Sequence, residues 1–191
     1  TGTYSCSDAA TNPFLVDKSL TIRANTNDAD AMISCSFTIA GADIAVVVQG
    51  LDFSVNINVD QAADVKILQN TLYNDKDIDV MDYKTTEGDG TLTGVGNHLT
   101  QNGDIEVINS NDAYIAANVL DIGQIDARVP VWIVGNSVVG YGGSSPVPPI
   151  EALSGTGNVH VIGNRVAMNG SNTHEGIDVI ASSALIAGNV V

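Results

Sequence analysis

Six acidic residues recur along the chain, each directly after an aliphatic residue. They are Asp60, Asp79, Glu106, Asp126, Glu151 and Asp178. Calcium prefers carboxylate and carbonyl oxygens and accepts flexible geometry. On stacked strands about 4.8 Å apart, neighbouring carboxylates would repel by about 1 kcal/mol or more per pair. Two interpretations stay open: calcium ions bridge the acids, or the acids form a solvated face that discourages pairing with other chains.

Three ring-bearing residues also recur at one position of a repeat, namely Tyr114, Trp132 and His160. An exposed row of rings can pack against sugar rings or a protein partner, since aromatic side chains join apolar area to a polar edge. Alternatively, the loop at 140–149, rich in Gly, Ser and Pro, folds over the rings and they form a satellite core. The row is the candidate ligand-binding site.

The repeat that would position these residues is carried by asparagines 18 to 28 residues apart: Asn70, Asn97, Asn118, Asn136, Asn164 and Asn189. The residues five and three positions before each asparagine are apolar in all but one case, with the period of two that places both on one face of a strand. The residue just before it is mostly small, which suits a bend in the left-handed region. The pattern predicts stacked repeats with a ladder of bonded asparagines.

Each aliphatic–acid pair is a second short strand, apolar inside and acidic outside. Three strings carry a resemblance: Ile-Gly-Asn-Arg-Val at 162–166, Val-Gly-Asn-Ser-Val at 134–138 and Gly-Ile-Asp-Val at 176–179. They resemble the right-handed parallel β-helix, or pectin-lyase-like, superfamily, well over 59–191 and weakly over 20–58. The resemblance implies an all-β solenoid of about eight rungs at 20–191, after an N-terminal cap segment at 1–19. That superfamily includes lyases, glycosidases, tailspikes and adhesins, so the fold does not settle activity.

The candidate catalytic residues are few. Adjacent acids of the row meet the carboxyl spacing of glycosidases by construction, so their spacing is no evidence of catalysis. His174 could act as a general acid or base, but a role in its turn is the simpler interpretation. The Asp-Asp, Gly-His-Gly and Arg-Ile-Lys strings expected of polygalacturonase-like enzymes are absent. We assign no catalytic residue and favour a protein without enzymatic activity.

Composition narrows the choice of partners. The formal net charge is −15, from 22 acids against 7 bases. This argues against nucleic acid, which needs a cationic footprint, and against a polyanionic glycan. It fits an extracellular or high-salt setting, and no run of about 18 apolar residues predicts a membrane span. Cys6 and Cys35 either form a disulfide that ties the cap segment to an early rung or are two buried thiols; their spacing is not that of a metal site.

Two functions compete at this point. The first is a non-enzymatic extracellular β-solenoid, adhesive or filament-forming, with calcium as a candidate stabilising ion. The second is a carbohydrate-active solenoid that binds a glycan along the aromatic row. Val191 occupies an inward position with no polar cap after it. We therefore expect either that the native chain continues or that this end docks on the next copy, which would build a fibre.

Overall fold

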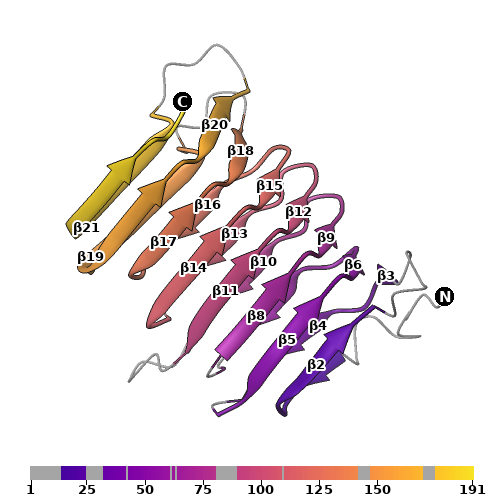
Figure 1. Ribbon diagram of the computed structural model, residues 1–191. Helices are drawn as coiled ribbons and strands as arrows, with labels where there is room; N and C mark the ends of the chain where they lie inside the picture. Colours follow the sequence, from indigo (N-terminus) through magenta and orange to yellow (C-terminus); the bar gives the residue numbers. More distant parts are fainter. Residues whose placement is uncertain are drawn as a thin grey trace.

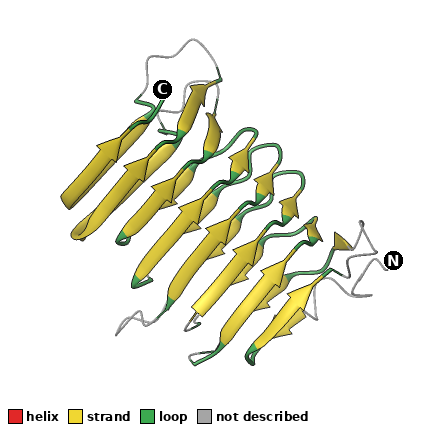
Figure 2. Cartoon of the chain, viewed as in Figure 1, coloured by secondary structure: helices red, strands yellow, loops and turns green. Residues whose placement is uncertain are grey.

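A computed structural model describes residues 14–24, 32–41, 43–60, 62, 64–80, 90–108, 110–141, 147–169 and 175–191. This part of the chain consists of β-strands joined by turns and loops and contains no helix (Figure 2). Short triplets such as Ile-Asp-Val and Ile-Glu-Val favour strands, because β-branched side chains pack well on a pleated surface.

The strands fall into three rows, and the chain visits each row in turn. Row 1 begins with β1 (Phe14–Val16), β4 (Phe37–Ile39), β7 (Ile57–Val59), β10 (Ile78–Val80), β13 (Ile105–Val107) and β16 (Ile125–Ala127). Row 2 begins with β2 (Leu20–Arg23), β5 (Ala45–Gln49), β8 (Asp64–Leu68), β11 (Thr91–Val95), β14 (Asp112–Ala116) and β17 (Val131–Val134). Row 3 contains β3 (Met32–Ile33), β6 (Asp52–Phe53), β9 (Thr71–Leu72), β12 (His98–Leu99), β15 (Val119–Leu120), β18 (Ser137–Gly140) and β20 (Arg165–Met168).

Two long strands, β19 (Ile150–Ile162) and β21 (Ile177–Ala187), run through rows 1 and 2 without a break. The first part of β19 pairs with β16 and its last part with β17, so rows 1 and 2 form one 14-stranded sheet, while row 3 forms a seven-stranded sheet. All the pairings between these strands are parallel, and each strand bonds to its counterpart one rung earlier or later. The stack is consistent with a parallel β-solenoid, and Figure 1 shows row 2 advancing from β2 to β21.

The core lies between the rows and is built from alternating inward side chains. The residues five positions before the repeating asparagines are 0–2% exposed over five rungs: Val65, Leu92, Ala113, Val131 and Val159. Phe37 and Phe53 close the core near the N-terminal rungs, with ring centroids 5.3 Å apart in an edge-to-face arrangement. Ile186 on β21, an inward position by register, is 53% exposed.

The first rung starts earlier than the sequence pattern indicates. β1, inside the segment expected to be a cap, pairs in register with β4, and Phe14 stacks on Phe37 with ring centroids 5.4 Å apart. Residues 14–16 therefore belong to row 1. Residues 1–13 lie outside the described part of the chain.

Candidate functional site

The repeating asparagines lie at the corner between rows 2 and 3 and bond to one another from rung to rung. Asn97 is representative. Its Oδ1 accepts from the backbone N–H and the Nδ2 of Asn70, at 3.0 and 3.1 Å. Its Nδ2 donates to Oδ1 of Asn118 and to the carbonyl of Ile67, at 3.0 and 2.8 Å. Every hydrogen-bonding position of this side chain is thus occupied, so the ladder serves the fold.

The bend before each ladder position has a left-handed backbone. Gly96, Gly135, Gly163 and Gly188 have φ between 62° and 68°, and Gln69 and Ala117 adopt the same region at 54° and 53°. Gly50 repeats this bend one rung before Asn70, where the backbone N–H of Leu51 donates to Oδ1 of Asn70 at 3.0 Å. The turn geometry is therefore retained even where the asparagine is absent.

Row 1 brings five of the predicted acids together. Asp79, Glu106, Asp126, Glu151 and Asp178 occupy the same middle position of successive strands and pair directly with one another. This position alternates with inward aliphatic residues, so the acids face outward.

Asp60 does not lie in this row. The register places Asn58 opposite Asp79, because the strand triplet is Ile57-Asn58-Val59 and Val59 pairs with Val80. The pair Val59-Asp60 resembles the other aliphatic–acid pairs, but Val59 is the second inward residue of its strand rather than the first. Asp60 instead follows β7, where its backbone N–H donates to the carbonyl of Ile39 at 2.8 Å. Its Oδ1 is buried without a hydrogen-bond partner among the described residues.

A second, shorter acidic column of Asp77 and Asp104 lies beside the first, each residue directly before its strand and two positions before Asp79 and Glu106, and the aliphatic–acid pattern missed it. Asp77 Oδ1 accepts the backbone N–H of Asp104 at 2.8 Å, and Asp104 Oδ1 accepts the backbone N–H of Gln124 at 2.7 Å. The hydroxyl of Tyr141 donates to the same Asp104 oxygen at 2.6 Å. The period of two in Asp77-Ile-Asp79 and Asp104-Ile-Glu106 is the signal that could have identified this column.

Two acids of row 1, Asp79 and Asp104, hold their protons more tightly than free carboxyls do. Burial raises the pKa of Asp79 to about 6, against a hydrogen bond from Asn56 that lowers it, and the charges of Asp77 and Glu106 raise it further. Burial also raises the pKa of Asp104 to about 6, although the bonds from Tyr141 and Gln124 lower it.

One cation partly offsets the charge of the row. Arg128 donates to Asp126, with Nη2 2.9 Å from Oδ2. Burial raises the pKa of Glu106 and of Glu151, the neighbouring Asp126 charge raises both further, and Arg128 lowers both. The raised pKa values and this ion pair therefore reduce part of the repulsion that the sequence pattern predicts between neighbouring carboxylates.

The structure gives no preformed metal centre in the part of the chain it describes. No three His, Cys, Asp or Glu side chains converge there closely enough to hold a metal ion. Among those residues, the carboxylates of row 1 are arranged along a column, one on each strand, rather than in a cage. Calcium binding by the row consequently stays a prediction.

The ring-bearing residues are adjacent on row 2. Tyr114 pairs with Trp132, and Trp132 pairs with His160. The rings of Trp132 and His160 are stacked, with centroids 3.7 Å apart and planes 10° apart. Tyr114 is 43% exposed and Trp132 45% exposed. These two rings are open to solvent, which favours a surface role over a satellite core.

The described ends of the 140–149 loop lie elsewhere. Tyr141 directs its hydroxyl to Asp104, at the start of a row 1 strand two rungs earlier. The chain after β18 therefore turns toward row 1 and away from the outer face of row 2. Residues 142–146 are outside the described part of the chain.

Two further predictions fall partly or wholly outside the described residues. Cys6 is not described and Cys35 is buried, so the proposed disulfide stays a prediction. His174 also lies in a segment that is not described.

Nothing in the described part of the chain is a helix with the length and apolar character of a bilayer span. Comparison of the chain with protein-family models, with curated proteins and with solved structures finds no match. The function of the chain is therefore inferred from the geometry of rows 1 and 2.

Proposed function

We propose that this chain is a non-enzymatic extracellular β-solenoid with a structural, adhesive role, built as a right-handed parallel β-helix of about eight rungs similar to the pectin-lyase-like superfamily. The carrying observation is the asparagine ladder, in which Asn70, Asn97, Asn118 and Asn136 are each about 1% exposed and bonded to the next rung. Such a ladder stiffens a rod along its axis. An active site, in contrast, needs a local arrangement that is not repeated, whereas the acids of row 1 recur rung after rung.

The test is a search for products. The protein is incubated with a panel of neutral and acidic polysaccharides, and new reducing ends and unsaturated sugars are measured. We expect neither to form above the level of a heat-denatured control. Product formation that Glu151→Gln abolishes would overturn the structural proposal and place an active site on row 1.

Calcium is the proposed stabilising ion of row 1, supported by the unbroken pairing of five acids there. Calcium binding to the folded state would raise the melting temperature in proportion to its free energy of binding. We expect a chelator to lower this temperature and Glu106→Gln to weaken the response. Asp121→Asn, an exposed acid 3.0 Å from His98 and not part of the paired row, is the control. An equal response in both variants, or none in the wild type, would leave only a solvated acidic face.

End-to-end association of copies into a filament is part of the same proposal. Exposed apolar side chains on β21 support it, with Ile180 62% and Ile186 53% exposed. Sedimentation over a range of concentrations tests it. We expect a rise in mass with concentration that Ile186→Lys reverses, and a constant monomer mass would contradict it.

The second candidate is a carbohydrate-active solenoid. Its specific support is the exposure of Tyr114 and Trp132 on adjacent strands. Glycan binding alone does not distinguish the two candidates, because the first candidate is compatible with it. Formation of cleavage products does distinguish them, because it is incompatible with the first candidate.

A further inference from the structure

The outer face of row 2 carries a ten-residue surface without charge, formed by β11, β14, β17, β19 and β21. One column contains the larger side chains: Thr93, Tyr114, Trp132, His160 and Leu185. The neighbouring column contains smaller aliphatic ones: Val95, Ala116, Val134, Ile162 and Ala187. We call these ten residues the uncharged ledge.

The aliphatic column occupies outward positions although every member is apolar; Ala116 within it is 7% exposed, and Val95, Val134 and Ile162 are half-buried. Its residues lie two positions after the rings in the strand, and side chains two apart share a face. In an ordinary solvated sheet this face would carry polar residues. Five consecutive rungs depart from that pattern, which marks the ledge as a surface with a partner.

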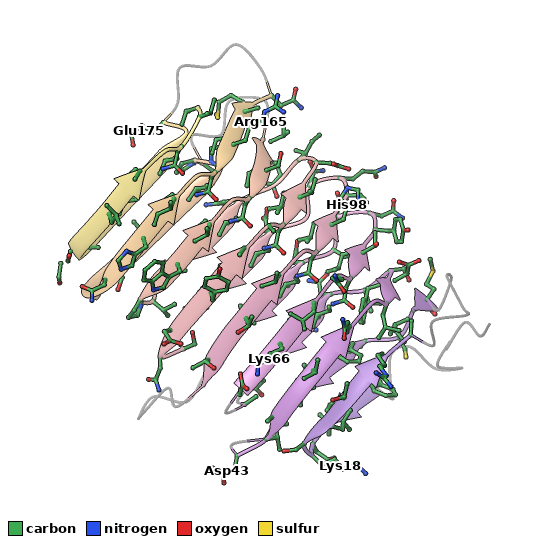
Figure 3. The ribbon with its side chains drawn as sticks, viewed as in Figure 1. Lys18, Asp43, Lys66, His98, Arg165 and Glu175 are labelled. Atoms are coloured by element: carbon green, nitrogen blue, oxygen red, sulfur yellow. The ribbon has the colours of Figure 1, made fainter. Side chains whose placement is uncertain are left out.

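Charge is separated between the rows of this molecule. The chain has 22 acids, and those of row 1 form two adjacent columns, whereas the ledge has none. The nearest charged side chains of row 2 lie at its margin, among them the exposed Asp112 on β14, two residues before Tyr114. Lys66 projects from β8 (Figure 3) and forms an ion pair with Asp64 at 3.2 Å.

The corner beside the ledge adds no obstruction. Its positions before the asparagines are Gly96, Ala117, Gly135, Gly163 and Gly188. Nothing lies within 4 Å of a Cβ built on Gly135 or Gly163, so the surface is open there. The column of larger side chains thus lies beside the column of smaller aliphatic ones, which borders the open corner.

The size of the ledge excludes a stable dimer through this face alone. Five strands about 4.8 Å apart and three residues of about 3.3 Å across give a patch of roughly 20 by 10 Å, or about 200 Å². A stable protein interface buries about 800 Å² on each partner. The patch instead suits an extended chain that lies along the solenoid axis.

We propose that the uncharged ledge binds a neutral, extended glycan chain, an inference that rests on the adhesive role proposed above. The apolar C–H faces of sugar rings would cover Val134 and its neighbours, and sugar hydroxyls would meet the polar edges of Tyr114 and Trp132. The strand spacing of about 4.8 Å is close to the advance of one sugar residue in an extended β-linked chain. A carboxylated glycan would be repelled by the net charge of −15.

Trp132 is the one tryptophan of the chain, so its fluorescence reports directly on the ledge. The protein is titrated with cellohexaose, chitohexaose, laminarihexaose and, as the charged comparison, an oligogalacturonate of equal length. We expect a saturable change in emission with at least one neutral hexamer and none with the oligogalacturonate. Shorter oligomers of the neutral glycan should bind more weakly, since fewer rungs are covered.

Two variants and one matched control locate the site. Val134→Lys places a charge in the ledge, and Tyr114→Ala removes a ring; each should weaken binding at least tenfold. Val119→Lys makes the same change as the first variant at an exposed residue of row 3 and should leave binding unchanged. Melting temperatures of all three verify that they fold.

Four results would overturn the inference. They are no response to any neutral hexamer, an equal response to the oligogalacturonate, equal loss in Val119→Lys, and a dimer that Val134→Lys disperses. The last would assign the ledge to a second copy. None of these results involves cleavage of a polysaccharide. The proposal that the protein has a structural, non-enzymatic role is tested separately, by the assay for new reducing ends and unsaturated sugars.

Discussion

Asn118→Ala tests how much the ladder contributes to the stability of the fold. Asn118 is 1% exposed. It accepts from the backbone N–H and Nδ2 of Asn97, and it donates to the carbonyl of Gly94 and to Oδ1 of Asn136. Alanine takes away the partner of the Asn97 backbone N–H and of the Gly94 carbonyl, and it leaves Asn97 Nδ2 and Asn136 Oδ1 with one bond each. Each buried group that loses its partner costs about 1–3 kcal/mol. Allowing for partial entry of water, we expect a loss of about 4 kcal/mol, a large fraction of the 5–15 kcal/mol typical of a domain.

The matched control is Asn189→Ala. Asn189 accepts the same two bonds from Asn164 and donates to the carbonyl of Val161, but it is only partly buried. Water can replace its bonds, so its loss should cost about 1 kcal/mol. Denaturant unfolding measures both, with the midpoint lowered and the slope unchanged if the fold is retained. Equal losses in the two variants would refute the view that burial of the ladder sets its contribution.

Four other substitutions should have measurable effects on stability. The pKa of about 6 for Asp104 in the folded protein exceeds its ordinary value of 3.8, so the folded state binds the proton more tightly and stability falls as pH rises through this interval. Asp104→Asn keeps an acceptor for Tyr141. It should therefore stabilise the protein by about 1 kcal/mol at about pH 7.5, after allowance for solvent screening, but not at about pH 4. A gain in stability that is the same at both pH values would contradict this. Ala117→Gly should stabilise and Gly135→Ala destabilise by about 1 kcal/mol each, because only glycine adopts a positive φ without strain; equal signs in thermal unfolding would refute it. Gly94→Ala should stabilise by about 1 kcal/mol, since its buried Cβ would meet nothing within 4 Å and adds one methyl group to the core; a lower melting temperature would show that the space is not available.

The inward pattern could be read from the sequence because it is local and repeated. Two apolar residues and an asparagine at fixed offsets, as in the stretch from Val131 to Asn136, determine which face is buried and where the corner falls. The parallel strand pairing agrees with that pattern over Asn70 to Asn189. Each further rung shows the same agreement between the sequence pattern and the strand pairing.

The outward residues were less predictable, for two physical reasons. First, a short strand with two inward residues is ambiguous by two positions, and this ambiguity moved Asp60 into a row where Asn58 lies. Second, contacts made by loops have no periodic signal. The bond from Tyr141 to Asp104 joins residues 37 apart, and nothing in the sequence around either residue indicates it.

The aliphatic column of the ledge can be seen in the sequence. A search for charged or aromatic residues does not detect it. It lies two residues before each asparagine, at Val95, Ala116, Val134, Ile162 and Ala187. An apolar residue in a strand is ordinarily assigned to the core, and only the register shows that these five occupy outward positions. The signal is therefore the conflict between their apolar character and their parity in the strand.

The outer faces of rows 1 and 2 can differ because a stacked fold constrains its inward and outward positions separately. Inward residues and the asparagine corner determine the register, so the outward positions can vary without disturbing it. On row 1 those positions hold acids at a cost in desolvation and, to a smaller extent, in repulsion, seen in the raised pKa values of Asp79 and Asp104. On row 2 they hold apolar groups at a cost in exposure, seen at Trp132, which is 45% exposed. The cations proposed for row 1 and the uncharged chain proposed for row 2 would offset these two costs.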